Sequence, residues 1–172
     1  DNDGHQDLFI SNGILRRPNG LDFKKYVSST FKRYGEAQGL QWLYRSINEM
    51  PSGKTSNQIF KGNSQKFQET TGEWIAKKAS LANGAIYVDL DLDGDLDLVT
   101  NNVNEPAGIF ENTLNDSKNF SSIQLRYKVA NKEAIGAKVR VFSNGNTQER
   151  HVQKSRGFFS SISCKLHFGL DT

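Results

Sequence analysis

The chain has 172 residues, a hydrophobic fraction of 35% and a net charge of +3, which is enough for one substantial core or two small ones. Its basic residues are scattered, without the dense run that marks a nucleic-acid-binding surface, so we expect no nucleic-acid partner. No apolar run reaches the roughly 18 residues of a membrane span, and a single cysteine excludes an intrachain disulfide.

The composition favours short strands joined by turns, because 15 glycines accompany many Asn and Ser residues. We therefore predict a mainly β fold. The first twelve residues, DNDGHQDLFISN, resemble the segment DLDGDLDLVTNN, which lies 90 residues later. Repeats at a fixed period indicate propellers, solenoids or arrays, and a period this long requires an insertion.

Residues 20–50 form that predicted insertion. Apolar residues follow helical spacing on both sides of Gly35 and Gly39, which predicts two short amphipathic helices, and Pro51 ends the segment. The aromatic residues of the helices are interpreted as a packing face, with a ligand platform as the alternative. Four further aromatic residues could form a carbohydrate-binding platform, but we expect them to be buried: Trp42, Tyr44, Phe60 and Trp74.

Short strands follow the insertion. The pattern predicts strands at 58–60, 66–68, 85–88 and 96–100. A polar linker at 112–119 then separates two predicted regions, 1–119 and 120–172. In the second region, alternating apolar residues predict strands at 123–129 and 137–141, and Asn144-Gly145 predicts a two-residue hairpin turn.

The most informative segment is acidic. Five of the 19 acidic residues lie in DLDLDGDLD, between Asp89 and Asp97. In loops of the type DxDxDGxxD, oxygen atoms at positions 1, 3, 5, 7 and 9 converge on a hard cation, and glycine permits the sharp turn. Oxygen ligands in a flexible loop favour Ca²⁺ over Zn²⁺ and over tightly hydrated Mg²⁺. The predicted ligands are the side chains of Asp89, Asp91, Asp93 and Asp97 and the backbone oxygen of Asp95.

The acidic segment has two alternative interpretations. An EF-hand needs a glutamate at position 12, where Thr100 stands, and helices on both sides, so that alternative is rejected. An acidic turn without metal is disfavoured, because neighbouring carboxylates repel one another.

The first copy of the loop is predicted to bind metal weakly or not at all. It supplies Asp1, Asp3, Asp7 and the backbone carbonyl of His5, but its first ligand position would precede residue 1. We therefore expect the chain to be part of a larger protein.

These motifs resemble the FG-GAP/VCBS repeat family. The likeness includes Asn57–Asn63 with Phe67, Leu81–Asp91, Asn101-Asn102 and Ile109–Asn112. The sequence departs from the family pattern at Gly62, Gln65 and Leu92. This resemblance implies β-propeller blades with calcium loops, interrupted here by the helical insertion.

The end of the chain resembles the ASPIC/UnbV domain, which follows such repeats in large secreted or surface bacterial proteins. The segments that carry the likeness are 134–141, 148–152, 156–161 and 167–170. The resemblance implies that 120–172 is part of a small β domain.

Other candidate residues have weaker signals. His151 and His167 match no zinc-ligand or catalytic spacing and are interpreted as structural, and Cys164 as a small packing residue. Arg156 with Phe158 and Phe159 is compatible both with a clamp for a carboxylate or sugar and with a strand followed by a turn.

Taken with the resemblances, the sequence predicts a calcium-binding, non-catalytic module of a bacterial surface or secreted protein, located outside the cytoplasm. It would bind an extracellular ligand, either carbohydrate or protein. The alternative is a scaffold or substrate-groove part of a polysaccharide lyase or hydrolase. Glycoside hydrolysis uses two carboxylates across a cleft, and the glutamates form no recognisable pair, so we expect no catalytic residues and no cofactor other than Ca²⁺.

Overall fold

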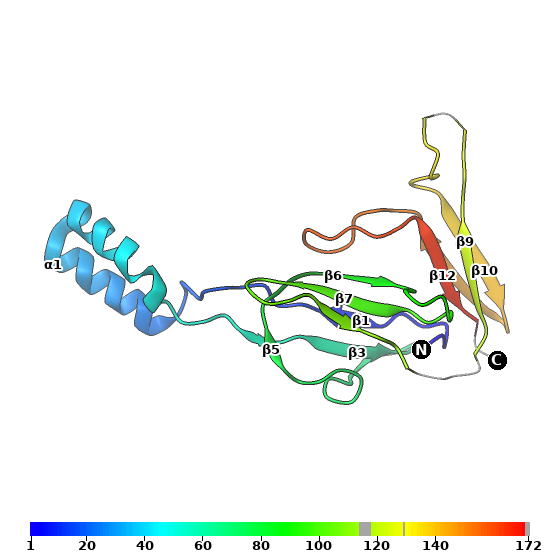
Figure 1. The fold of residues 1–172 in the computed structure, drawn as a ribbon, viewed down its shortest axis with the longest axis horizontal. Coiled ribbons are helices and arrows are strands. Elements are labelled where there is room, and N and C mark those ends of the chain that lie inside the picture. The colour runs from blue at the N-terminus through cyan, green and yellow to red at the C-terminus, as the bar shows by residue number, and fades with distance from the viewer. Residues whose placement is uncertain (114–117, 129, 171–172) are drawn as a thin grey trace.

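The computed structural model describes residues 1–113, 118–128 and 130–170. Within these residues the chain is mainly β, as predicted, with several small antiparallel sheets and one helical hairpin (Figure 1). In the described residues, no helix is long and apolar enough to cross a membrane.

The first sheet has the order β1-β3-β4, formed by β1 (Leu8–Ile10), β3 (Gln58–Gly62) and β4 (Phe67–Glu69). The predicted strands at 58–60 and 66–68 are confirmed. Their turn is closed by Asn63, whose Oδ1 accepts hydrogen bonds from the backbone N–H groups of Gln65 and Lys66, both at 2.9 Å. A second, two-stranded pair joins β2 (Thr55–Ser56) to β5 (Ala79–Ser80).

The second three-stranded sheet repeats one strand pair of the first. It contains β6 (Ala82–Val88), β7 (Asp97–Asn102) and β8 (Gly108–Phe110), in that order. Strands predicted on both sides of the acidic loop are therefore confirmed. Leu98 of β7 pairs with Phe110 of β8, as Leu8 pairs with Phe60 in the first sheet. The 90-residue sequence repeat is thus also a structural repeat.

The start of the chain, which contains β1, contacts the second sheet and its acidic loop at two points. Beyond the end of β1, Gly13 lies so close to Asn83 that an added Cβ would come within 2.3 Å of Asn83 Oδ1. At the other end, the Asn2 side chain donates a hydrogen bond to Gly94 O at 3.2 Å. The start of the chain therefore contacts the second sheet at both ends.

Helix α1 (Leu21–Arg45) is two helical arms joined at Gly35, and a short 3-10 helix (Ser46–Glu49) follows it. Gly35 has φ 73° and ψ 179°, a conformation that essentially only glycine adopts. The arms fold back on each other, and an added Cβ at Gly39 would lie 2.9 Å from the Phe31 ring. The predicted two-helix insertion is confirmed.

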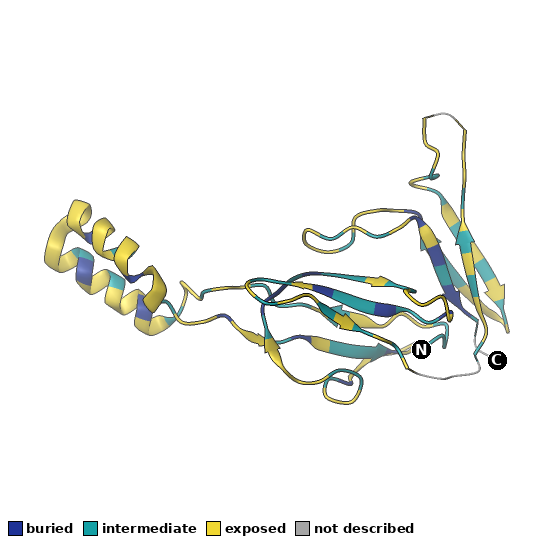
Figure 2. Cartoon of the chain, viewed as in Figure 1, coloured by how far each residue is buried: buried dark blue, intermediate teal, exposed yellow. Residues whose placement is uncertain are grey.

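The hairpin buries Phe23, which is 7% exposed, but the expected burial of Trp42 and Tyr44 is wrong. The hairpin projects from the sheets on a narrow stalk (Figure 1), and most of its residues are exposed (Figure 2). Trp42 is 42% exposed and Tyr44 is 73% exposed, because within the described residues the hairpin has little beyond its own two arms to pack against. Phe60 and Trp74, which lie outside the hairpin, are half-buried.

The C-terminal part of the chain forms two strand pairs. Strand β9 (Phe120–Gln124) pairs with β12 (Lys165–Gly169), and β10 (Lys138–Ser143) pairs with β11 (Asn146–His151). The predicted Asn144-Gly145 turn is confirmed, with φ 49° and 77° at its two residues. These strands enclose the main apolar cluster of buried side chains: Val152, Cys164, Leu166 and Phe168.

The first strand of this unit is shorter than predicted. The alternating pattern predicts a strand at 123–129, but β9 ends at Gln124, where its partner β12 begins at Lys165. The Tyr127 N–H then donates to Lys132 O at 3.1 Å and starts a turn. Apolar and polar residues continue to alternate after Gln124, but among the described residues no strand pairs with 125–128. Val129 and linker residues 114–117 lie outside the described residues.

Candidate metal centre

The acidic loop connects β6 to β7, and its backbone is held by its own carboxylates. The Asp93 N–H donates to Asp91 Oδ1 at 3.4 Å, and the Asp95 N–H donates to Asp93 Oδ1 at 2.8 Å. Leu92 and Gly94 have φ of 66° and 96°, which turns the chain sharply enough for alternate side chains to face inward.

Three of the five predicted ligands come together in this loop. Asp89, Asp91 and Asp93 each place a carboxylate oxygen within 4.8 Å of the other two. Asp89 Oδ1 is buried and, within the described part of the chain, has no hydrogen-bond partner. A buried carboxylate oxygen without a partner is costly. The donor set of three carboxylates and the orphaned oxygen therefore fit a hard cation such as Ca²⁺.

The other two predicted ligands have structural partners. Asp97 is 3% exposed. Its Oδ2 accepts from the Leu90 N–H at 2.9 Å, and its Oδ1 accepts from the Asn112 N–H at 2.8 Å. These bonds tie the two ends of the loop to each other and to the residues that follow β8, and each carboxylate oxygen still has a second lone pair. The Asp95 side chain accepts a hydrogen bond from Asn2 Nδ2 at 2.9 Å. The predicted metal ligand of Asp95 is its backbone oxygen, which this bond does not occupy.

The first acidic loop has the same backbone arrangement as the second. The Asp3 N–H donates to Asp1 Oδ1 at 3.3 Å, and the His5 N–H donates to Asp3 Oδ1 at 2.9 Å. Asn2 and Gly4 have φ of 54° and 82°. The two loops therefore share their turn geometry as well as their sequence.

A lysine lies among the carboxylates of the first loop. Lys61 Nζ forms an ion pair with Asp1 and lies 3.3 Å from Asp3 Oδ2. Burial opposes ionisation of Asp3, but the hydrogen bond from the His5 N–H and the Lys61 ammonium outweigh it and hold the pKa of Asp3 below its ordinary value. The first loop thus has an internal cation.

The register of the two sheets explains this difference between the loops. Lys61 follows Phe60 in β3, and Glu111 follows Phe110 in the second sheet, so the two residues occupy equivalent positions. The first repeat therefore has a basic residue where the second has an acidic one. Aligning the repeats past the loops would have revealed this exchange from the sequence.

The two acidic loops also contact the C-terminal unit, through Phe120 and through His167, which the sequence predicted only as a structural residue. His167 Nε2 lies 2.6 Å from Asn2 Oδ1, and its ring stacks on Phe120 with centroids 5.6 Å apart. An added Cβ at Gly94 would lie 2.0 Å from the Phe120 ring. Burial lowers the pKa of His167, although the Asp89 carboxylate acts in the opposite direction. The loops therefore lie at the junction between the repeats and the C-terminal strands.

The remaining candidate residues lie apart from the loops. His151 is exposed and lies 3.1 Å from Glu149 Oε1. Arg156 Nε is buried and, in the described residues, has no hydrogen-bond partner. Phe158 and Phe159 are 66% and 88% exposed, in a turn and not in a strand.

Comparison with known proteins gives one match. No curated protein and no solved structure matches the chain. The FG-GAP/VCBS resemblance of residues 1–119 stays a prediction. Residues 128–172, which contain β10, β11 and β12, match the family described as ASPIC and UnbV, and this confirms the resemblance of the C-terminal part of the chain.

Proposed function

We propose that this chain is a calcium-stabilised, non-catalytic binding module, with Ca²⁺ held by the loop between β6 and β7. The observation that supports this most directly is the buried, unpartnered Asp89 Oδ1 beside the carboxylates of Asp91 and Asp93. Asp97 and the Asp95 backbone oxygen complete the proposed ligand set. Calcium would supply the positive charge that lets these carboxylates approach one another.

The proposed role of this site is structural. Asp97 links the loop to Asn112, which follows β8, and Asn2 links it to the start of the chain, so ordering the loop also orders its neighbours. A cation that binds only the folded chain stabilises it by mass action, by about 2.7 kcal/mol at a concentration 100 times its Kd. Removing calcium should therefore lower stability.

We propose further that residues 1–119 belong to a propeller-type array of the FG-GAP/VCBS kind. The support is the repeated unit of acidic loop, strand and paired strand, with the same Leu–Phe register in both copies. With the ASPIC and UnbV match that follows it, this suggests a bacterial surface or secreted protein that binds an extracellular carbohydrate or protein. Calcium sites of moderate affinity suit that environment.

Calorimetric titration of chelator-treated protein tests the calcium site. We expect one Ca²⁺ per chain, no comparable binding of Mg²⁺, and a higher melting temperature with Ca²⁺. Asp93→Asn should abolish binding, because it removes a charge from the cluster while keeping an acceptor for the Asp95 N–H.

Asp3→Asn is the matched control, because Asp3 occupies the equivalent position in the loop that already contains Lys61. This variant should bind Ca²⁺ as the wild type does. Equal loss in both variants, or a melting temperature that chelation leaves unchanged, would contradict the proposal.

A further inference from the structure

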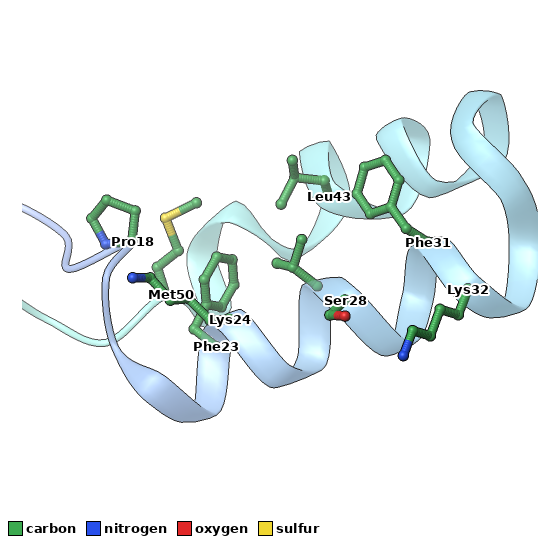
Figure 3. Close-up of a pocket in the computed structure, with 9 residues that line it drawn as sticks. Pro18, Phe23, Lys24, Ser28, Phe31, Lys32, Leu43 and Met50 are labelled. Atoms are coloured by element: carbon green, nitrogen blue, oxygen red, sulfur yellow. The ribbon is translucent and has the colours of Figure 1, made fainter.

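The helical hairpin carries an apolar groove that nothing in the described residues covers. The groove has a volume of about 710 Å³ and lies along the inner side of the first arm. In Figure 3, Phe23, Phe31, Leu43 and Met50 turn toward the space between the two arms. The groove residues that project from the first arm, Phe23, Val27 and Phe31, are spaced four residues apart and therefore form one row.

A second row of residues borders the apolar row. Lys24, Ser28 and Lys32 also follow a spacing of four residues and line the same groove. Lys24 and Lys32 are exposed. They are eight residues apart on one arm, which separates them by about 12 Å along the helix axis. The groove is therefore an apolar channel with a basic edge.

The hairpin and its stalk also carry the positive charge of the whole chain. Residues 16–50 have a net charge of +4, whereas the complete chain has +3, so the rest of the molecule is slightly acidic. The hairpin charges come from seven basic and three acidic residues: Arg16, Arg17, Lys24, Lys25, Lys32, Arg33 and Arg45, and Asp22, Glu36 and Glu49. Such a segment repels a second copy of itself and attracts an acidic partner.

We propose that this groove docks an amphipathic helix of a partner protein, with acidic residues along the edge that faces Lys24 and Lys32. A concave apolar channel suits the apolar ridge of a helix, formed by residues at i, i+4 and i+7. The two lysines set the register of the partner, because acidic residues about two turns apart would meet both. The proposal does not depend on the calcium loop, which lies at the ends of β6 and β7 that face away from the hairpin (Figure 1).

A displayed library of 16-residue helical peptides, randomised among Leu, Phe, Ala, Gln, Glu and Lys, tests this proposal. The whole chain should enrich peptides with an apolar ridge and with Glu in preference to Lys beside it. Binding of an enriched peptide, measured by fluorescence anisotropy, should weaken at least tenfold in the Lys24→Glu, Lys32→Glu double variant. The same peptide with its edge Glu residues changed to Lys should bind that variant better than the wild type.

The control is the Lys77→Glu, Lys78→Glu double variant, which makes the same charge change at exposed positions outside the hairpin and should bind as the wild type does. All four lysines are exposed, so far-UV circular dichroism should show unchanged folding. The proposal is overturned if no peptide is enriched, if the enriched peptides show no acidic preference, or if both double variants lose binding equally. Binding to phosphatidylglycerol vesicles without any peptide selection would overturn it in favour of a membrane surface.

Discussion

At the scale of single residues, Leu92 shows how the second loop differs from the first. It has φ 66° and is 78% exposed, so little packing offsets the cost of its left-handed conformation. Its equivalent in the first loop, Asn2, has φ 54° and donates to Gly94 O and Asp95 Oδ1. Asparagine tolerates this conformation far better than leucine does.

Leu92→Asn should therefore stabilise the chain by about 1 kcal/mol, since it relieves the backbone strain and removes an exposed apolar side chain. Urea unfolding in the presence of a chelator measures the effect without a contribution from bound calcium. The reverse change, Asn2→Leu, should destabilise the chain by more than that, because it also removes hydrogen bonds to Gly94, Asp95 and His167. A lower free energy of unfolding for Leu92→Asn would disprove this explanation.

The candidate site could be predicted from the sequence only where its residues are close together in the chain. The alternate aspartates between Asp89 and Asp97 and the glycine turn predicted the cluster. Lys61 was missed because it reaches Asp1 and Asp3 from 60 and 58 residues away, through the pairing of β1 with β3. The contact of His167 with Asn2 was missed for the same reason, because it spans 165 residues.

At the scale of elements, the shape of the hairpin depends on the backbone of one residue. Gly35 lies between the two arms of α1, and, apart from its neighbours in the chain and the adjoining helix backbone, no atom of the described residues lies within 4 Å of the position that a Cβ would occupy. A larger side chain would therefore fit in space, and its whole cost would be conformational. Tyr34 and Trp42 stack next to this turn, with ring centroids 5.7 Å apart.

Gly35→Ala should destabilise the hairpin by about 1–3 kcal/mol, because alanine does not adopt φ 73° with ψ 179° without strain. The fluorescence of Trp42 in a Trp74→Phe background reports the loss of stacking on Tyr34. Gln38→Ala is the control, since residue 38 is exposed and helical, so alanine should preserve or increase helicity. Unchanged Trp42 fluorescence in Gly35→Ala would show that the turn tolerates other residues.

The elements themselves were largely predictable, whereas their extent and surroundings were not. Helical spacing and two glycines predicted both arms of α1, but periodicity cannot show which partner covers an apolar face. Trp42 and Tyr44 were therefore wrongly expected to be buried. Similarly, the alternation of apolar and polar residues predicted a strand that ends at residue 129. The length of β9 is instead set by its pairing with the distant strand β12.

At the scale of the whole molecule, burial is uneven. The main buried apolar cluster lies in the C-terminal unit, where Phe168 is 0% exposed and Val152 is 1% exposed. In the two three-stranded sheets and their loops, the buried apolar side chains in the described residues are Leu81 and Ala82. The repeats therefore depend more on hydrogen bonds and loop contacts than the C-terminal strands do.

Hydrogen exchange should consequently be slowest in β9 to β12 and faster in β1, β3 and β4, because opening the first sheet exposes little apolar surface. Addition of Ca²⁺ should slow exchange in β6 and β7 and leave the hairpin unchanged. Mass spectrometry of peptic fragments measures these rates. Equal protection in all sheets would indicate a single cooperative unit.

The stalk of the hairpin has a consequence for how this chain can vary. The Arg17 N–H donates to Pro51 O at 2.8 Å, and the Gly53 N–H donates to Leu15 O at 3.1 Å, so the two ends of the insertion are already adjacent. Closing a loop between adjacent ends costs little entropy, and that cost rises slowly with loop length. The strands therefore provide a fixed insertion point. A short turn, or an inserted sequence of another specificity, could replace residues 18–50 without a change in the strands.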